Sequence, residues 1–168
     1  MERTRAGILA GARAGIVSEG VRRVSMARVA ELGGVAKATV YNHVRSKADL
    51  LALVAHDLVD RAGDAAEQAP DLARGLVAAA TLLGQDPVVR AVAQQEPVVI
   101  GRLLRVLADP VWDPARNRLA AVSAAHQHPM DAATADLVLR WLATVTVAPP
   151  PGPEAEDLLR AGAAHLMS

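Results

Sequence analysis

The polar side chains best suited to binding chemistry are concentrated in one short stretch of the chain, from Lys37 to His43. An amine, a hydroxyl, a phenol, an amide and an imidazole stand there within seven residues. These groups offer hydrogen-bond donors and a positive charge, which suit the phosphate oxygens and base edges of a nucleic acid. Lys47 adds a second ammonium group shortly afterwards. The stretch therefore indicates a surface that binds a polyanion.

Two short helices joined by a glycine turn are predicted to position these groups. Ser25 is a typical N-cap, and Met26, Val29 and Ala30 follow it at the spacing of one apolar helix face. The glycines at 33 and 34 end this helix, because glycine reaches left-handed backbone conformations without a Cβ clash. A second helix then carries the polar groups on its outer side.

The second helix is predicted over residues 36–43, with Val40 and Val44 facing inward. Ser46 is the expected cap of a third helix, and a helix over about residues 3–19 would support the motif. A helix, a glycine turn and a short polar-faced helix make a helix-turn-helix. The second helix of this motif usually enters the major groove of DNA.

The two ends of the chain differ in charge, although the net charge of the whole is zero. Residues 1–50 hold nine Lys or Arg against four Asp or Glu, a net charge of +5, and residues 51–168 have a net charge of −5. A basic face confined to one end indicates binding to nucleic acid. A solvated helix surface could have the same charge, so the helix-turn-helix pattern decides in favour of DNA.

The composition favours an all-α protein, since 52% of the residues are apolar and little of the sequence alternates as a strand would. The absence of cysteine excludes disulfides and thiolate metal sites, and it fits a cytoplasmic protein. Arg13 interrupts the apolar N-terminal run, which argues against a signal peptide. No uncharged apolar run approaches the roughly 18 residues of a membrane span, so no membrane partner is expected.

The helix that begins at Lys47 is predicted to continue to about Ala66 and to link two domains. Its acidic second half reverses the local charge. We therefore expect a helix-turn-helix domain over residues 1–46 and a helical domain over residues 47–168. Caps and prolines predict six further helices, about ten in all, over residues 72–83, 87–95, 97–108, 115–128, 132–148 and 154–166, with a loop over 110–114.

The N-terminal pattern resembles the DNA-binding signature of the TetR family of transcriptional regulators. The similarity lies in the run from Val29 to Val35, in Lys37-x-Thr39-Val40-Tyr41-x-His43, and in Ser46-Lys47-x-x-Leu50-Leu51. It covers about residues 5–55. The remainder is similar to the family only in its helical architecture, although the segment around residues 135–149 resembles the penultimate helix that many members use for dimerisation.

The resemblance implies a homodimer that binds a near-palindromic operator in double-stranded DNA and responds to an unknown small-molecule effector. Two residues depart from the family pattern, because Ala36 stands where a capping side chain is usual and Val44 where Phe is commonest. The residues expected to contact DNA are Ser25, Met26, Lys37, Ala38, Thr39, Tyr41, Asn42, His43 and Lys47.

Some of these residues also have a purely structural interpretation. Lys37 could be a solvated lysine, Thr39 could bond to its own helix backbone, and Tyr41 could pack in the core instead of contacting a phosphate. Asn42 and His43 could reach either the groove or only the DNA backbone. The sequence leaves these alternatives open.

Candidates for an effector pocket are the large or charged side chains on otherwise apolar helices, namely Trp112, Trp141, Arg102 and Arg105. Tryptophan is also ordinary core material, and the arginines could instead pair with a carboxylate or lie at the dimer interface. The helices over about 115–128 and 131–148 are expected to pair across the dimer as a four-helix bundle. The candidate interface residues are Leu119, Val122, His126, Leu137, Arg140, Trp141 and Val145.

No catalytic motif, cofactor or metal site is predicted. His126 and His128 stand at positions i and i+2, which point to different sides of a helix, unlike the i, i+4 pair of a zinc helix. A small helical enzyme that uses these histidines and Asp131 is the least favoured interpretation.

The sequence thus predicts an all-α, homodimeric, ligand-responsive transcriptional repressor that is not an enzyme. The alternative is a helical dimeric sensor or interaction protein that has lost specific DNA binding. The missing cap at Ala36 and the modest basic charge support this alternative.

Overall fold

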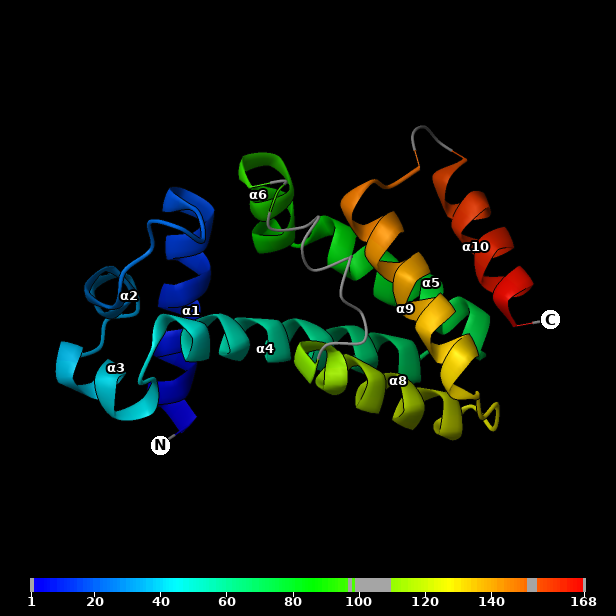
Figure 1. The fold of residues 1–168 in the computed structure, drawn as a ribbon, viewed down its shortest axis with the longest axis horizontal. Coiled ribbons are helices and arrows are strands. Elements are labelled where there is room, and N and C mark those ends of the chain that lie inside the picture. Colours follow the sequence, from blue (N-terminus) through cyan, green and yellow to red (C-terminus); the bar gives the residue numbers. More distant parts are fainter. Residues whose placement is uncertain (1, 97, 99–109, 151–153, 168) are drawn as a thin grey trace.

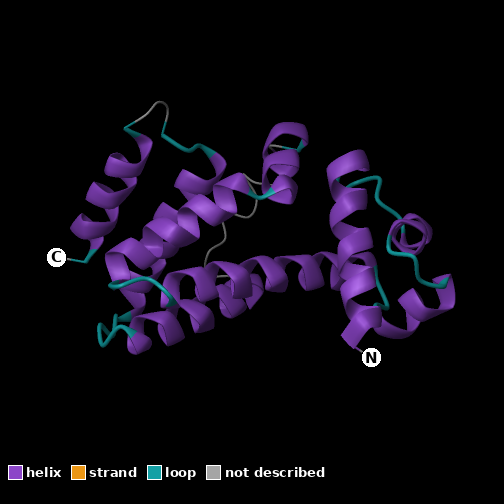
Figure 2. Cartoon of the chain, turned by 180° about the vertical axis from the view of Figure 1, so that it is seen from behind, coloured by secondary structure: helices purple, strands orange, loops and turns teal. Residues whose placement is uncertain are grey.

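Helices make up most of the part of the chain that the structure describes (Figures 1 and 2). The computed structural model describes residues 2–96, 98, 110–150 and 154–167. Within these ranges there are nine α-helices, one 3-10 turn and no strand, so the predicted all-α fold is confirmed. The elements are α1 (Glu2–Glu19), α2 (Met26–Leu32), α3 (Lys37–His43), α4 (Lys47–Glu67), α5 (Leu72–Gln85), α6 (Pro87–Gln95), η1 (Pro110–Trp112), α8 (Asp113–Ala125), α9 (Ala132–Val147) and α10 (Ala155–Leu166).

Helices α1, α2 and α3 lie at one end of an elongated molecule, and α5, α8, α9 and α10 lie toward the other (Figure 1). Helix α4 runs between the two groups, where it packs against α1 and against α5 and α8. Helix α6 contacts α1, α5 and α9. Both α4 and α6 therefore touch the two groups.

Side-chain caps begin most of the helices, as their sequences predict. Ser25 Oγ accepts a hydrogen bond from Arg28 N at 3.2 Å at the start of α2. Ser46 and Asp49 form a reciprocal capping box at the start of α4. A cap of this kind contributes about 1 kcal/mol to stability. Three aspartates cap later helices in the same way: Asp71, Asp86 and Asp131.

The close contact between α1 and α2 depends on glycine. An added Cβ at Gly11 would lie 2.2 Å from the carbonyl oxygen of Val29, and one at Gly33 would lie 2.3 Å from that of Gly7. The turn after α2 is made by Gly34, whose φ is +62°, whereas Gly33 stays right-handed. The glycine pair therefore serves two purposes, close packing at one residue and chain reversal at the next.

The buried residues form two hydrophobic cores. The first core joins α1, α2 and α3 to the beginning of α4 and includes Val40 and Leu50, which have no exposed surface. Val88 of α6 also belongs to this first core. The second core joins the end of α4 to α5, α8, α9 and α10 around Leu76 and Val138. Helix α6 thus packs with the N-terminal helices although it follows α5 in the chain.

Helix α5 does not end at Gly84, contrary to the prediction, and continues to Gln85. A glycine inside a helix costs only about 1 kcal/mol relative to alanine. The chain breaks one residue later, where Asp86 caps α6 and α6 is bent by 63° from α5. In the described part no single helix is long and apolar enough to cross a membrane, and α5 and α6 pass that test only when taken together.

Helix α8 begins and ends earlier than the sequence predicts. It begins at Asp113, not at residue 115, because Pro114 is accepted in the first turn of a helix. It ends at Ala125, and Gln127 then adopts a left-handed φ of 56°. The expected loop over 110–114 is consequently a 3-10 turn followed by a helix start. The helix expected over residues 97–108 falls, except for residue 98, outside the described residues.

Candidate DNA interface and ligand pocket

Helix α3 is anchored by one residue and turns the others outward. Val40 is fully buried, and Val44, directly after the helix, is buried in the same first core. Thr39 is partly buried, while the remaining candidates on this helix are exposed: Lys37, Ala38, Tyr41, Asn42 and His43. Tyr41 exposes 49% of its surface, so the tyrosine lies on the surface rather than in the core. Nearly the whole helix is therefore free to meet a partner.

The beginning of α3 has no side-chain cap. Ala36 adopts the extended backbone of an N-cap, with φ −65° and ψ 143°, but offers no oxygen to the first N–H groups of the helix. The neighbouring helices α2 and α4 both begin with a serine that does so. The predicted absence of a cap is therefore a real local difference between α3 and its neighbours.

The other candidate DNA contacts lie beside α3 on flanking elements. Ser25 is exposed at the start of α2, and Met26 is half-buried against the first core. Lys47 is exposed at the start of α4, and its Nζ donates to the carbonyl oxygen of Arg22 at 2.5 Å. This bond brings the beginning of α4 next to the turn between α1 and α2.

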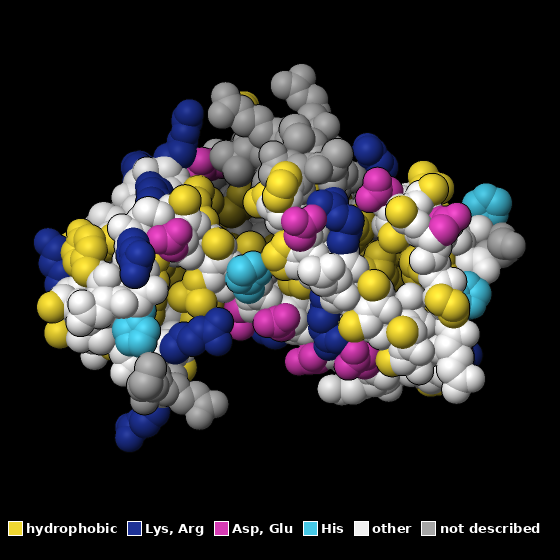
Figure 3. Space-filling view, turned by 60° about the horizontal axis from the view of Figure 1, so that its bottom comes forward, with side chains coloured by type: hydrophobic (Ala, Val, Ile, Leu, Met, Phe, Trp, Pro, Cys, Tyr) yellow, Lys and Arg dark blue, Asp and Glu magenta, His cyan; other side chains and the backbone are white. Residues whose placement is uncertain are grey.

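Lys and Arg side chains gather around the end of the molecule formed by α2 and α3 (Figure 3). Lys37 and Arg45 are exposed, and no ion pair within the described residues neutralises either of them. Arg28 differs, because it pairs with Glu31 at 2.8 Å and with Glu19 at 2.9 Å. The hydrogen bond to Glu31 raises the pKa of Arg28 above its ordinary value. Lys37 on α3 and Arg45 just before α4 therefore keep positive charges that no described carboxylate neutralises.

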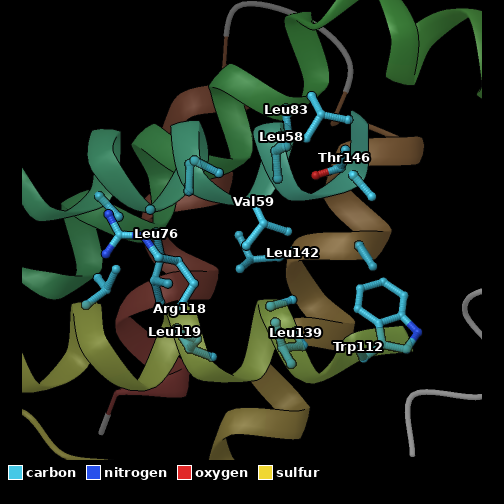
Figure 4. Close-up of a pocket in the computed structure, with 18 of the residues that line it drawn as sticks. Leu58, Val59, Leu76, Leu83, Trp112, Arg118, Leu119, Leu139, Leu142 and Thr146 are labelled. Carbon is cyan, nitrogen blue, oxygen red and sulfur yellow. The ribbon is translucent and has the colours of Figure 1, made fainter. Parts of the chain in front are cut away.

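A cavity of about 280 Å³ lies inside the second core, between α4, α5, α8 and α9 (Figure 4). Its walls consist mainly of alanine, valine and leucine side chains, such as Val59, Leu76 and Leu142. Trp112 and Arg118 lie toward opposite ends of the view. The sequence pointed to Trp112 but not to the aliphatic lining, because residues that line a cavity have the same helical spacing as residues that fill a core.

The other pocket candidates do not reach this cavity or cannot be placed. Trp141 is not among the lining residues. Its indole packs on α10, where an added Cβ at Gly162 would lie 2.8 Å from Trp141 Nε1. Trp141 therefore does not line this cavity, because its indole packs against α10 instead. Arg102 and Arg105 lie outside the described residues.

Two of the predicted dimer-interface residues are buried in the second core. Leu119 and Val122 are buried in the second core and line the cavity, because α8 packs this face against α4. Their side chains have almost no surface to offer a second copy, so their burial does not favour this part of the interface prediction. On α9, Leu137 and Arg140 are exposed, whereas Trp141 and Val145 are partly buried against the second core.

The histidines after α8 have separate surroundings. His126 Nε2 lies 2.9 Å from the carbonyl oxygen of Ala66, so this ring joins α8 to α4. His128 is exposed, and Asp131 caps α9 through Thr134 N. Within the described residues no group of three His, Asp or Glu side chains could hold a metal ion.

An ion-pair cluster ties the start of α6 to α1 and α4. The Asp86 carboxylate, whose side chain has no exposed surface, accepts from Val88 N at 2.9 Å and pairs with Arg13 and with Arg61, the latter at 3.0 Å. Arg13 also pairs with Asp57 at 3.1 Å. Burial would raise the pKa of Asp86, but the hydrogen bonds from Arg13, Val88 N and Arg61 outweigh it and hold the pKa below its ordinary value.

The end of α6 reaches the turn between α1 and α2. Glu96 Oε1 accepts from Arg22 N at 3.0 Å. Gly20 permits this approach, because its φ is +83° and an added Cβ would lie 2.8 Å from Glu96 Oε1. Helix α6 also contributes Val89 to the cavity lining. One short helix thus contacts both the cavity and the helix-turn-helix.

Comparisons of the sequence and of the fold with known proteins both find bacterial transcriptional regulators. Residues 8–54 match the family model described as bacterial regulatory proteins, tetR family. No curated protein matches the chain in sequence. The solved structure of SCO7518 from Streptomyces coelicolor A3(2), assigned as a transcriptional regulator, is 20% identical over 99% of both chains, with a TM-score of 0.65.

Two further structures have the same fold along nearly their whole length. The TetR family repressor AlkX from Dietzia sp. strain DQ12-45-1b, which is implicated in biodegradation of n-alkanes, is 20% identical over 96% of this chain and 94% of its own, with a TM-score of 0.65. RolR in complex with resorcinol is 20% identical over 99% of this chain and 94% of its own, with a TM-score of 0.56. The helix-turn-helix of this chain therefore matches the tetR family in sequence, and the whole chain shares the fold of these solved regulators.

Proposed function

We propose that this regulator is a cytoplasmic, homodimeric repressor that binds a near-palindromic operator and releases it when a small molecule binds. The observation that carries the proposal is the exposed polar face of α3, which Val40 and Val44 hold on the first core. Lys37 and Tyr41 stand four residues apart, so they share one side of this helix. Ser25 and Lys47, at the starts of α2 and α4, would contact phosphates and orient the helix.

The proposed response to a ligand uses the cavity and the two helices that link it to the helix-turn-helix. RolR, a protein with the same fold, binds resorcinol, which supports a small organic effector for this chain as well. A ligand that widens the cavity would move α4 or α6, and both helices pack on the first core. A ligand can only shift the balance between two arrangements by its different affinity for each, typically 1–3 kcal/mol.

The proposed dimer forms through the outer faces of α9 and α10. Leu137 of α9 is 56% exposed and Leu158 of α10 is 54% exposed, although both helices pack on α5. A two-fold interface would cover these leucines. To bind two half-sites, the dimer has to hold its two copies of α3 at the separation of successive major grooves, about 34–36 Å. Leu137 and Arg140, which the sequence predicts at the interface, remain part of this proposed interface. Residues of α10 take the place of the buried residues of α8.

Selection of bound DNA from a random pool would test the proposal directly. The expected result is one enriched sequence with approximate two-fold symmetry. Lys37→Ala and Tyr41→Phe should each weaken binding to that operator by about 1–3 kcal/mol, because each removes a contact to a base edge or a phosphate. Circular dichroism and the molar mass in solution should stay unchanged. Affinity should also fall steeply as salt rises.

Arg90→Ala is the matched control for the lysine variant. Arg90 is exposed on α6, away from α3, and no ion pair involves it within the described residues. This variant removes one positive charge and should bind the operator as the wild type does. Equal losses in the control and in Lys37→Ala would show only a general charge effect and would contradict the role of α3.

The alternative function is a dimeric sensor or interaction protein that no longer binds a specific DNA sequence. The uncapped start of α3 at Ala36 is the observation that favours it. A stable dimer that enriches no sequence from the pool would support this alternative. An enriched operator whose binding depends on Lys37 would exclude it.

A further inference from the structure

We propose that the cavity of the second core takes a neutral, elongated aliphatic molecule with a single hydrogen-bonding group, and that the hydroxyl of Thr146 binds this group. The inference rests on the proposed ligand-responsive function, and it adds the chemical class of the ligand and the residue that selects it. Thr146 lies on α9 and lines the cavity (Figure 4).

The lining of the cavity is almost wholly aliphatic. Of its twenty residues, seventeen are alanine, glycine, valine or leucine, and the others are Trp112, Arg118 and Thr146. A wall of this composition favours a ligand by the area of apolar surface that it buries. A single aromatic side chain at one end gives a flat ring little to stack on.

The cavity is long for its volume. Its lining residues on α4 run from Ala55 to Ala66, which is about 16 Å along the helix axis at 1.5 Å per residue. An engineered protein cavity of about 150 Å³ holds benzene. A volume of about 280 Å³ therefore has room for about ten non-hydrogen atoms, arranged as a chain rather than a disc.

Thr146 supplies the polar contact. Its Oγ1 is buried and has no hydrogen-bond partner within the described part of the chain. In Figure 4 the oxygen points from α9 toward Leu58, into the cavity. Thr144, two residues earlier, bonds in the usual way to the carbonyl oxygen of Arg140 at 2.8 Å. A buried hydroxyl is ordinarily paired, so Thr146 lacks a partner that a ligand hydroxyl or carbonyl would provide.

The charges around the cavity favour a neutral ligand. Arg118 is the charged residue of the lining, and it is already paired with Glu67 and with Asp64, the latter at 2.6 Å. The hydrogen bond that Arg118 donates to Glu67 lowers the pKa of Glu67 and raises the pKa of Arg118. An anionic ligand would have to compete with two carboxylates for this arginine. A cationic ligand would find no carboxylate among the lining residues.

Four probes of similar size test the class of ligand by calorimetry on the full chain without DNA: 1-decanol, decanoate, decylammonium and 1-naphthol. The alcohol should bind at least tenfold more tightly than the decanoate anion or the decylammonium cation. It should also bind more tightly than 1-naphthol, which has the same number of non-hydrogen atoms but is flat and wide. Tighter binding of either ion or of the aromatic probe would overturn the proposal, as would a failure of 1-decanol to bind.

Thr146→Val tests the role of the hydroxyl, because valine has nearly the same shape. This variant should bind 1-decanol about five- to tenfold more weakly. It should also melt at a higher temperature than the wild type without ligand, because an unpaired buried hydroxyl is removed. Thr144→Val is the matched control and should keep the affinity for 1-decanol. Unchanged binding in Thr146→Val would overturn the role of this residue.

The same proteins separate this inference from the proposed function. Operator binding is measured without ligand and depends on α3, whereas binding of 1-decanol is measured without DNA and depends on α9. A protein that binds its operator but not 1-decanol would overturn the ligand class alone. A protein that binds 1-decanol but enriches no DNA would contradict the repressor and leave the ligand class standing.

Discussion

Gly11 stands at the closest approach of α1 and α2, where an added Cβ would lie 2.2 Å from the carbonyl oxygen of Val29. Gly11→Ala should therefore destabilise the protein by about 2–3 kcal/mol, because the clash is with backbone that cannot turn aside. Gly84→Ala is the control, since its Cβ would meet only Thr146 O at 3.9 Å. That change should be neutral or should stabilise α5 by up to about 1 kcal/mol. Urea denaturation measures both, and equal stability of the two variants would contradict this account of α1–α2 packing.

Asp86 is the residue whose charge should matter most for stability. Its pKa is held below the ordinary value by Arg13, Val88 N and Arg61. A depressed pKa stabilises the folded state above the unfolded value of about 3.9, and this stabilisation is lost as the pH falls through the folded pKa. The wild type should therefore lose stability progressively below about pH 4.

Asp86→Asn keeps an oxygen that can cap α6 but removes the charge that Arg13 and Arg61 share. It should cost about 1–3 kcal/mol at pH 7, and this difference should shrink as the pH falls below about 4. Denaturation at several pH values checks the prediction. A difference that is the same at pH 7 and at pH 2 would show that the carboxylate charge is not the cause.

At the scale of elements, α3 is a short helix that begins at an uncapped residue. Ala36 already has the extended backbone of an N-cap, so Ala36→Ser should supply the missing acceptor without strain. The expected gain is about 0.5–2 kcal/mol, with slower hydrogen exchange in α3 and operator binding that is as tight or tighter. Ser25→Ala is the reverse case, because it removes the existing cap of α2 and should cost about 1 kcal/mol. Faster exchange in Ala36→Ser would refute the capping argument.

Helix α6 contacts both the N-terminal helices and the cavity. Asp86 at its start pairs with Arg13, and Glu96 after its end accepts from Arg22 N. Val88 packs in the first core, while the next residue, Val89, lines the cavity. A ligand that displaces Val89 would therefore act on a helix that is fastened to α1 at its start and to the turn after α1 at its end.

At the scale of the whole molecule, the proposed assembly depends on α9 and α10. Leu137→Glu and Leu158→Glu should each raise the dissociation constant of the dimer at least tenfold, because a charge would replace a leucine at the centre of an apolar contact. The molar mass measured by light scattering at decreasing concentration checks this. Val98→Glu is the control, because Val98 is 67% exposed but lies outside these helices. A wild-type chain that is monomeric at all concentrations would refute the homodimer.

The DNA-binding end of the molecule was largely predictable from sequence because its information is local. The caps at Ser25 and Ser46 and the glycine turn act over three or four residues, and each is found where expected. The missing cap at Ala36 and the burial of Val40 follow from the same short-range pattern. The boundaries of α5 and α8 were less accurate, since glycine and proline are tolerated at more than one helix position.

The sequence by itself determined the all-α fold, the helix-turn-helix and the separation of charge along the chain, because spacing and side-chain type suffice for these. Only the tertiary structure decided that α6 packs with the N-terminal helices, that Leu119 faces a cavity and that Trp141 does not. Such features depend on contacts between distant residues, as between Arg13 and Asp86, which are 73 positions apart. Aliphatic residues at helical spacing have the same sequence pattern whether they fill a core, line a cavity or form a dimer interface. Only their neighbours in space distinguish these cases.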